Sequence, residues 1–135
     1  MLAAALWVAA CQAASSAPRG SAVRVQQLEV HAEPGLQFSV KGQSPGPVRV
    51  AAGREVRWVV VNRDTVQHDL WVVGASDRSP YLSPAFPQAR TPLLDPGARY
   101  ELRFVPTSPG RYRYVCTVPG HDASMHGELV VEAAR

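Results

Sequence analysis

Residues 112–127 read YRYVCTVPGHDASMHG, and this stretch decides how the rest of the chain is interpreted. An alternating segment ends at Cys116, and His121 and Met125 follow it in the spacing Cys-x4-His-x3-Met. A thiolate, an imidazole and a thioether suit copper better than calcium or magnesium. A mononuclear electron-transfer copper takes two histidines, one cysteine and a weak axial methionine. The loop offers three of these four ligands, and we expect His68 in VVNRDTVQHDLWVV to be the fourth.

Each of these residues also has an ordinary structural interpretation. Cys116 could be a buried core cysteine, and His68 could face the core and donate to a backbone carbonyl. His121 could be a surface-loop residue, and Met125 could simply close one end of the fold. Four ligand types in this order and spacing favour a single mononuclear copper site instead. The other histidines of the chain are not expected to be ligands.

The ligand stretch resembles the copper loop of the cupredoxins, the blue copper proteins, with a spacing similar to that of azurins. Further matches are PG-x-Y-x-Y-x-C at residues 109–116, Pro-Gly before His121, Met125-x-Gly127 and Asn62-x5-His68. The resemblance covers residues 23–133. It implies a cupredoxin-like β-sandwich that binds one copper ion per chain and carries single electrons. It also implies a monomer that is not an enzyme and meets redox partners transiently, for example a cytochrome or a reductase.

The pattern of the remaining chain favours the same fold class. Apolar residues alternate in short segments separated by glycine and proline turns, which is typical of a two-sheet sandwich. We predict an all-β, Greek-key antiparallel sandwich of seven to eight strands. Residues 68–73 are expected to form a strand that carries His68, and Tyr100 is expected to face inward with Leu102 and Phe104. Residues 74–97 contain five prolines and predict a long surface loop.

Composition limits the classes of function. The chain has 135 residues with 46% hydrophobic content, enough for one domain with a core. The net charge of +3 comes almost wholly from scattered arginines, so nucleic-acid binding is not expected. Copper delivery or storage in the periplasm is the alternative function, but such proteins are rich in exposed methionine and histidine. Two methionines and four histidines favour the electron carrier instead.

The N-terminal residues 1–22 differ from the domain predicted over residues 23–135. Residues 2–10, LAAALWVAA, are too short to span a bilayer and resemble the apolar part of an export signal. Val8-Ala9-Ala10-Cys11 resembles a lipobox, which would make Cys11 a lipidated N-terminus attached to the membrane. Ordinary cleavage just downstream would instead release a soluble protein. Either route predicts export to the bacterial periplasm or cell envelope, with residues 12–22 as a tether.

Asp69 departs from the cupredoxin pattern, which usually has asparagine after the first histidine ligand. A carboxylate near copper would favour the more highly charged Cu(II) state and lower the reduction potential. It could accept hydrogen bonds from Thr117 or from loop amides. The opposing interpretation is that Asp69 points to solvent or pairs with an arginine, where screening would leave little effect.

Overall fold

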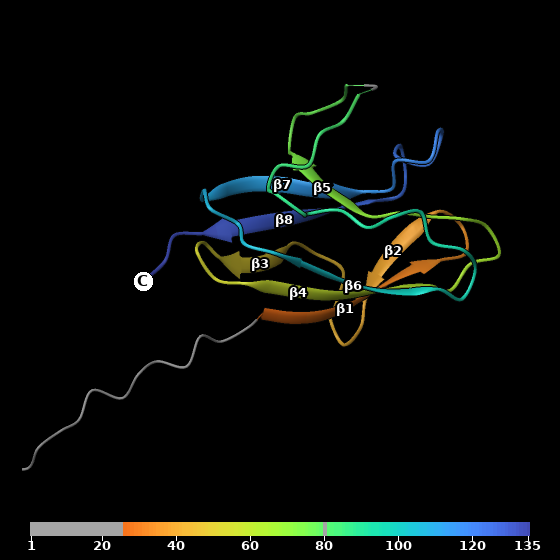
Figure 1. Ribbon diagram of the computed structural model, residues 1–135, viewed down its shortest axis with the longest axis horizontal. Helices are drawn as coiled ribbons and strands as arrows, with labels where there is room; N and C mark the ends of the chain where they lie inside the picture. Colours follow the sequence, from red (N-terminus) through yellow and green to blue (C-terminus); the bar gives the residue numbers. More distant parts are fainter. Residues whose placement is uncertain (1–25, 80) are drawn as a thin grey trace, which may run out of the picture.

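Two β-sheets packed face to face make up the computed structural model, which describes residues 26–79 and 81–135 (Figure 1). The predicted signal and tether, including Cys11, lie outside the described residues. The described ranges contain eight strands and no helix. They therefore include no helix that could cross a membrane. The predicted all-β sandwich is therefore confirmed.

Each sheet has four strands. One sheet has the order β2-β1-β4-β6, formed by β2 (Gln37–Val40), β1 (Gln26–Glu33), β4 (Val56–Asn62) and β6 (Arg99–Phe104). The other has the order β3-β8-β7-β5, formed by β3 (Val48–Ala51), β8 (His126–Glu132), β7 (Gly110–Val115) and β5 (Trp71–Gly74). The chain changes sheet after each strand from β2 to β6.

The pairing is mixed and not purely antiparallel as predicted. Four of the six strand pairs are antiparallel, whereas β1 pairs with β4 and β3 pairs with β8 in parallel. These two pairs join strands that are distant in the sequence and are connected through the opposite sheet, so no tight turn forces them to reverse direction. The alternation of apolar and polar residues along a strand does not show whether the neighbouring strand runs parallel or antiparallel to it.

The core lies between the sheets and follows the alternation seen in the sequence. Along β4, Val56, Trp58 and Val60 are fully buried, while the residues between them are half-buried. The Trp58 ring stands edge-on to Phe104 at 5.6 Å and to Tyr114 at 5.5 Å, measured between ring centroids. This aromatic contact joins the two sheets and fixes the position of β7, the strand that leads to the ligand stretch.

Two local expectations differ from the structure. Tyr100 is 38% exposed, and it lies on β6, an edge strand. His68 precedes β5 and is held by an isolated antiparallel bridge to Leu94.

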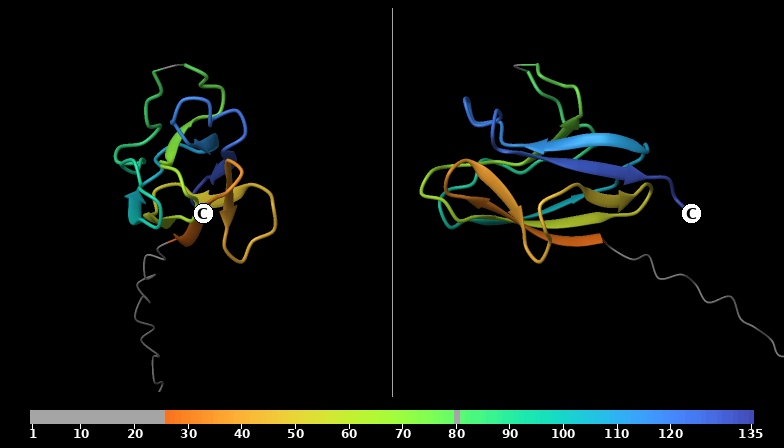
Figure 2. Two further views of the ribbon diagram at one scale, coloured as in Figure 1. Left: turned by 90° about the vertical axis from the view of Figure 1, so that its right-hand side faces the viewer. Right: turned by 180° about the vertical axis from the view of Figure 1, so that it is seen from behind.

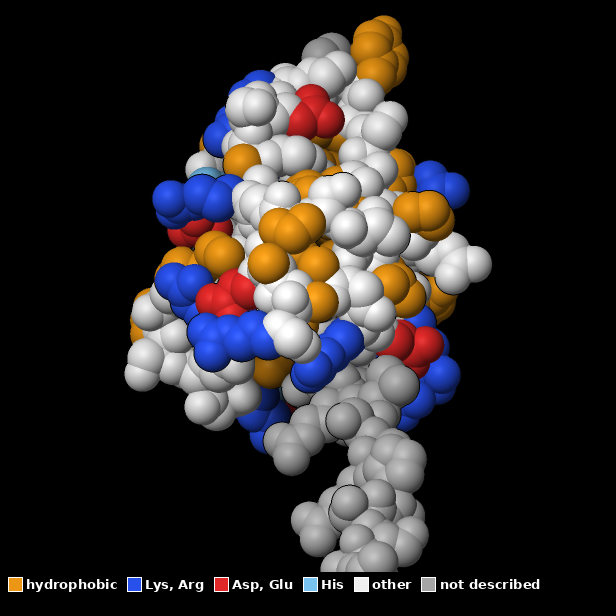
Figure 3. All heavy atoms as spheres, turned by 90° about the vertical axis from the view of Figure 1, so that its left-hand side faces the viewer, with side chains coloured by type: hydrophobic (Ala, Val, Ile, Leu, Met, Phe, Trp, Pro, Cys, Tyr) orange, Lys and Arg blue, Asp and Glu red, His pale blue; other side chains and the backbone are white. Residues whose placement is uncertain are grey.

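The end of the sandwich that carries the ligand stretch is built by three loops. The segment after β7, the segment before β5 and the turn after β1 come together there (Figure 2, left). The described part of the long loop, residues 75–79 and 81–98, has no helix and passes beside this end, where Leu94 bonds to both backbone groups of His68. At the opposite end, basic and acidic side chains are interspersed with small apolar areas (Figure 3).

Candidate metal centre

Cys116 is the first residue after β7 and is fully buried. Its backbone N–H donates to the carbonyl of Met125 at 3.1 Å, and the N–H of Met125 donates to the carbonyl of His121 at 2.8 Å. These bonds fold residues 116–125 into a compact loop. These backbone hydrogen bonds bring the two ends of the loop together. They therefore place the three residues close to one another in space.

His68 approaches from the other side of the loop, 48 positions before Cys116 in the sequence. Its backbone N–H and C=O exchange hydrogen bonds with Leu94 at 3.2 and 2.7 Å, and its side chain is 1% exposed. His68 is thus fixed by the long loop and not by a strand. His121, in contrast, is partly exposed to solvent.

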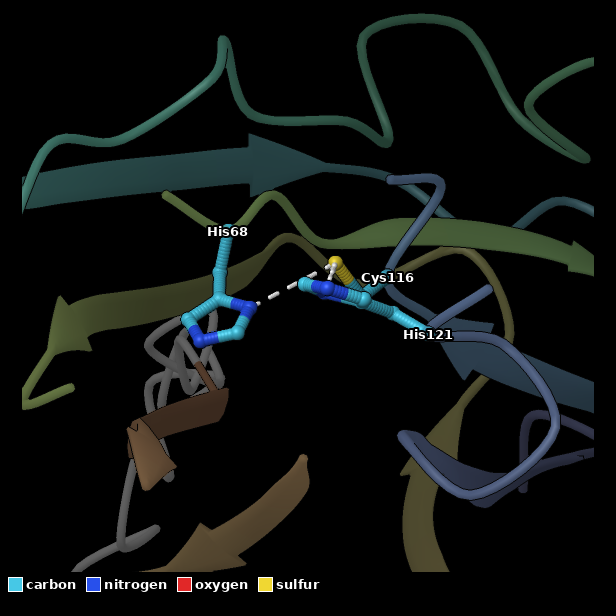
Figure 4. Close-up of side chains that lie close together, drawn as sticks. All are labelled: His68, Cys116 and His121. Carbon is cyan, nitrogen blue, oxygen red and sulfur yellow. Dashed lines mark hydrogen bonds between the residues drawn. The ribbon is translucent and has the colours of Figure 1, made fainter. Parts of the chain in front are cut away.

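The three side chains point toward one common position (Figure 4). Cys116 Sγ lies 3.8 Å from His68 Nδ1 and 3.7 Å from His121 Nδ1, and the donor atoms of all three lie within 4.8 Å of one another. A metal about 2.3 Å from sulfur and about 2.0 Å from nitrogen, with an angle near 120°, would place the two donors about 3.7 Å apart. The two sulfur–nitrogen distances therefore fit donors that would hold one ion together.

Met125 is also fully buried at this end. It forms a small apolar cluster with Cys116 and Ala32, separate from the main core, and Leu36, Phe38 and Val118 pack against this cluster. Met125 thus lies beside Cys116. A soft donor set of cysteine, two histidines and an adjacent methionine fits copper.

Burial raises the pKa of the Cys116 thiol to about 11. The backbone N–H groups of Asp69 and Val118 act in the opposite direction, and the negative charge of Asp69 raises the pKa further. The thiol of the metal-free protein is therefore neutral at pH 7. Binding of a cation must displace this proton, because the thiolate is the form that coordinates metals.

Asp69 is nearly buried, with 7% of its surface exposed. Its carboxylate accepts hydrogen bonds from the backbone N–H of Thr117, at 2.6 Å, and from the Thr117 hydroxyl. It therefore ties the segment of His68 to the segment of Cys116, through one of the partners expected from the sequence. The interpretation that placed Asp69 in solvent or on an arginine is wrong.

Two residues that position His68 were not identified from the sequence. Asp64 was not singled out, yet its Oδ2 lies 2.9 Å from His68 Nε2. Asn62 was only a position in a motif, but it is fully buried and bonds to three backbone groups around this turn. A carboxylate four residues before a ligand histidine was the signal that could have indicated Asp64.

Comparison with known proteins agrees with this chemistry. The sequence profile of copper-binding proteins of the plastocyanin/azurin family matches residues 27–132. Auracyanin-A of Chloroflexus aurantiacus is 44% identical over 43 residues, which are 32% of this chain and 26% of that protein. The matched segment thus spans about a quarter of the relative's length.

Solved structures match over a larger part of the chain. Auracyanin B is 30% identical, with a TM-score of 0.64 over 79% of this chain and 88% of that one. Auracyanin A, described as a "blue" copper protein from Chloroflexus aurantiacus, is 28% identical, with a TM-score of 0.61 over 78% and 98%. Reduced rusticyanin, at 23% identity and a TM-score of 0.63 over 78% of each chain, shows the same fold.

Proposed function

Because this chain belongs to the plastocyanin/azurin family of copper-binding proteins, we propose that it is a type 1 copper protein that carries single electrons between redox partners. In this proposal His68, Cys116, His121 and Met125 would hold the copper ion. The observation that carries it is the convergence of three soft or borderline donors within 4.8 Å of one another, on two buried residues and one partly exposed residue. Bound copper supplies the one-electron couple between Cu(I) and Cu(II).

The scaffold suits electron transfer because it holds the donors by backbone hydrogen bonds. His68 is fixed through Leu94, and Cys116 and His121 are fixed through Met125. None of these bonds depends on the oxidation state of a metal. The ligand positions are therefore expected to change little between the two states, which keeps the cost of each transfer small.

His121 is the proposed point of electron entry and exit, since it is partly exposed whereas His68 is buried. Val118 and the exposed Pro119 lie in the same loop and give its surroundings an apolar character. A small apolar contact of this kind favours weak and short-lived docking. We therefore propose a monomer that meets protein partners such as a cytochrome or a reductase transiently.

Voltammetry of the copper-loaded protein tests the carrier against copper delivery. We expect a reversible one-electron wave, with copper retained over repeated cycles in the presence of a Cu(I) chelator. Retention follows from the burial of Cys116, Met125 and His68. Loss of the reduced ion to the chelator in each cycle would favour delivery or storage instead.

Asp69→Asn is expected to raise the reduction potential, because it removes a buried negative charge that favours Cu(II). The substitution preserves the local bonding: the amide oxygen can accept from the Thr117 N–H, and the amide N–H can donate to the Thr117 hydroxyl. Protein-film voltammetry at neutral pH measures the shift. Asp95→Asn, on an exposed residue bonded to Gln67, is the control for net charge. An unchanged or lower potential in Asp69→Asn would show that Asp69 does not tune the centre.

We also propose that the protein is exported to the periplasm or cell envelope, with residues 23–135 as the copper domain. The support is the apolar run and lipobox-like sequence that end at Cys11. In this proposal Cys11 carries the lipid and residues 12–22 form the tether. Mass spectrometry of the protein from its native host decides between a lipidated Cys11 and a lipid-free N-terminus further downstream.

A further inference from the structure

Asp64 uses both carboxylate oxygens, and one of them contacts a proposed ligand. Oδ2 lies 2.9 Å from His68 Nε2, while Oδ1 accepts from the backbone N–H of Thr65 at 2.7 Å. The side chains of Asp64 and His68 are only 10% and 1% exposed. The pair is therefore largely shielded from water. It differs in this respect from ion pairs on the protein surface, which are exposed and weak.

The turn that carries Asp64 is held from inside the protein. The buried Asn62 accepts from the Asp64 N–H at 3.0 Å and donates to the carbonyls of Val66, at 2.8 Å, and Leu94, at 3.0 Å. Leu94 in turn bonds to both backbone groups of His68. Asp64 and His68 are thus placed by one hydrogen-bonded unit.

The contact determines which nitrogen of His68 is free. An ionised carboxylate can only accept, so in the neutral imidazole the proton must lie on Nε2. The unprotonated Nδ1 then faces the sulfur of Cys116 at 3.8 Å, where a metal would bind.

We infer that Asp64 is a positioning residue for the copper centre, selecting the tautomer and orientation of His68 and adding negative charge behind it. This inference rests on the proposed copper function. A carboxylate behind an imidazole ligand makes the ligand more basic, which favours Cu(II) over Cu(I) and lowers the reduction potential. A residue needed only for the turn would use Oδ1 on Thr65 and would not need its second oxygen on a buried histidine.

Asp64→Asn and Asp64→Ala separate the charge from the contact. The amide introduced by Asp64→Asn is nearly isosteric with the carboxylate, but it has one acceptor oxygen for two N–H donors, those of Thr65 and His68. Alanine removes both acceptors. Asp122→Asn is the matched control, because it makes the same change of charge on an exposed residue of the ligand loop.

The experiment has one readout without metal and two with copper. In the metal-free wild type, nitrogen NMR of the neutral His68 ring should show the proton on Nε2, and Asp64→Ala should show a mixture of tautomers. Loss of such a partner typically weakens metal binding about 10- to 100-fold, so Asp64→Ala should bind Cu(II) more weakly by this factor in a competition assay. Asp64→Asn should have a higher reduction potential than the wild type, and Asp122→Asn should resemble the wild type in all three measurements.

The outcomes distinguish this inference from the function on which it rests. If the wild type binds no copper or shows no intense visible band, the copper function fails. If the wild type is blue but both Asp64 variants match Asp122→Asn in tautomer, affinity and potential, only the positioning role is overturned. Because Asp64→Asn is nearly isosteric, its circular dichroism is expected to match the wild type, so the comparison holds even if Asp64→Ala folds poorly.

Discussion

Cys116→Ser is expected to abolish the intense visible absorption of the Cu(II)-loaded protein while the sandwich stays folded. The band of a type 1 centre comes from charge transfer between the thiolate and Cu(II), and a serine hydroxyl provides no such donor. The loss should therefore be complete, even if the two histidines still bind Cu(II) weakly. An absorption spectrum before and after addition of one equivalent of Cu(II) measures it.

The fold should survive this substitution because Cys116 lies outside the main core. It packs in the small cluster with Ala32 and Met125, and its backbone bond to Met125 remains. Burial of the serine hydroxyl costs about 1–3 kcal/mol. Circular dichroism of both metal-free proteins provides the comparison, and Ser124→Ala, on an exposed residue of the same loop, should stay blue. A colourless Cu(II)-loaded wild type, or a Cys116→Ser variant that keeps the band, would contradict the proposed ligand set.

Local patterns in the sequence were sufficient for much of the fold. Alternation placed Leu102 and Phe104 of β6 on the core side correctly, because a strand with one face on a core must alternate whatever its neighbours are. The loop residues Cys116, His121 and Met125 were found because they lie within ten residues of one another. The positions of these side chains depend on a few backbone hydrogen bonds within the loop. Their spacing in the sequence is therefore enough to predict that they lie together.

Features that depend on distant residues were less predictable. The parallel pairing of β1 with β4 depends on which sheet the intervening chain joins, and the alternation of β1 does not record this. His68 was predicted to be a ligand, but the residue that holds its backbone, Leu94, lies in a loop without a regular pattern. Asp64 resembled any aspartate in a turn until the structure placed it against His68.

Gly127→Ala is expected to destabilise the protein strongly, although the substitution adds a single methyl group. Gly127 lies on β8, directly opposite Tyr114 on β7. A Cβ at this position would overlap the Tyr114 ring, with Cε2 at 2.5 Å and two further side-chain atoms closer still. The ring cannot move aside easily, because it is 4% exposed and packs on Trp58 and Phe38, with centroid distances of 5.5 and 5.7 Å.

The expected loss is about 3 kcal/mol of unfolding free energy, the upper part of the usual range for overpacking in a core. Urea unfolding of the metal-free protein measures it without any contribution from bound copper. Gly74→Ala is the matched control, since a Cβ at the end of β5 would approach nothing closer than Asp77 Cβ, at 3.8 Å. We expect that variant to lose less than about 1 kcal/mol.

A second substitution shows whether the Tyr114 ring is the cause. In a Tyr114→Leu background the ring is absent, so Gly127→Ala should cost much less there than it does in the wild type, and the two effects should not add. Gly127 also lies two residues after Met125, so a displaced β8 should shift the ligand loop and change the visible spectrum of the copper form. If Gly127→Ala is no less stable than Gly74→Ala, the Tyr114 ring can move away from β8, and glycine is not required at position 127 for packing.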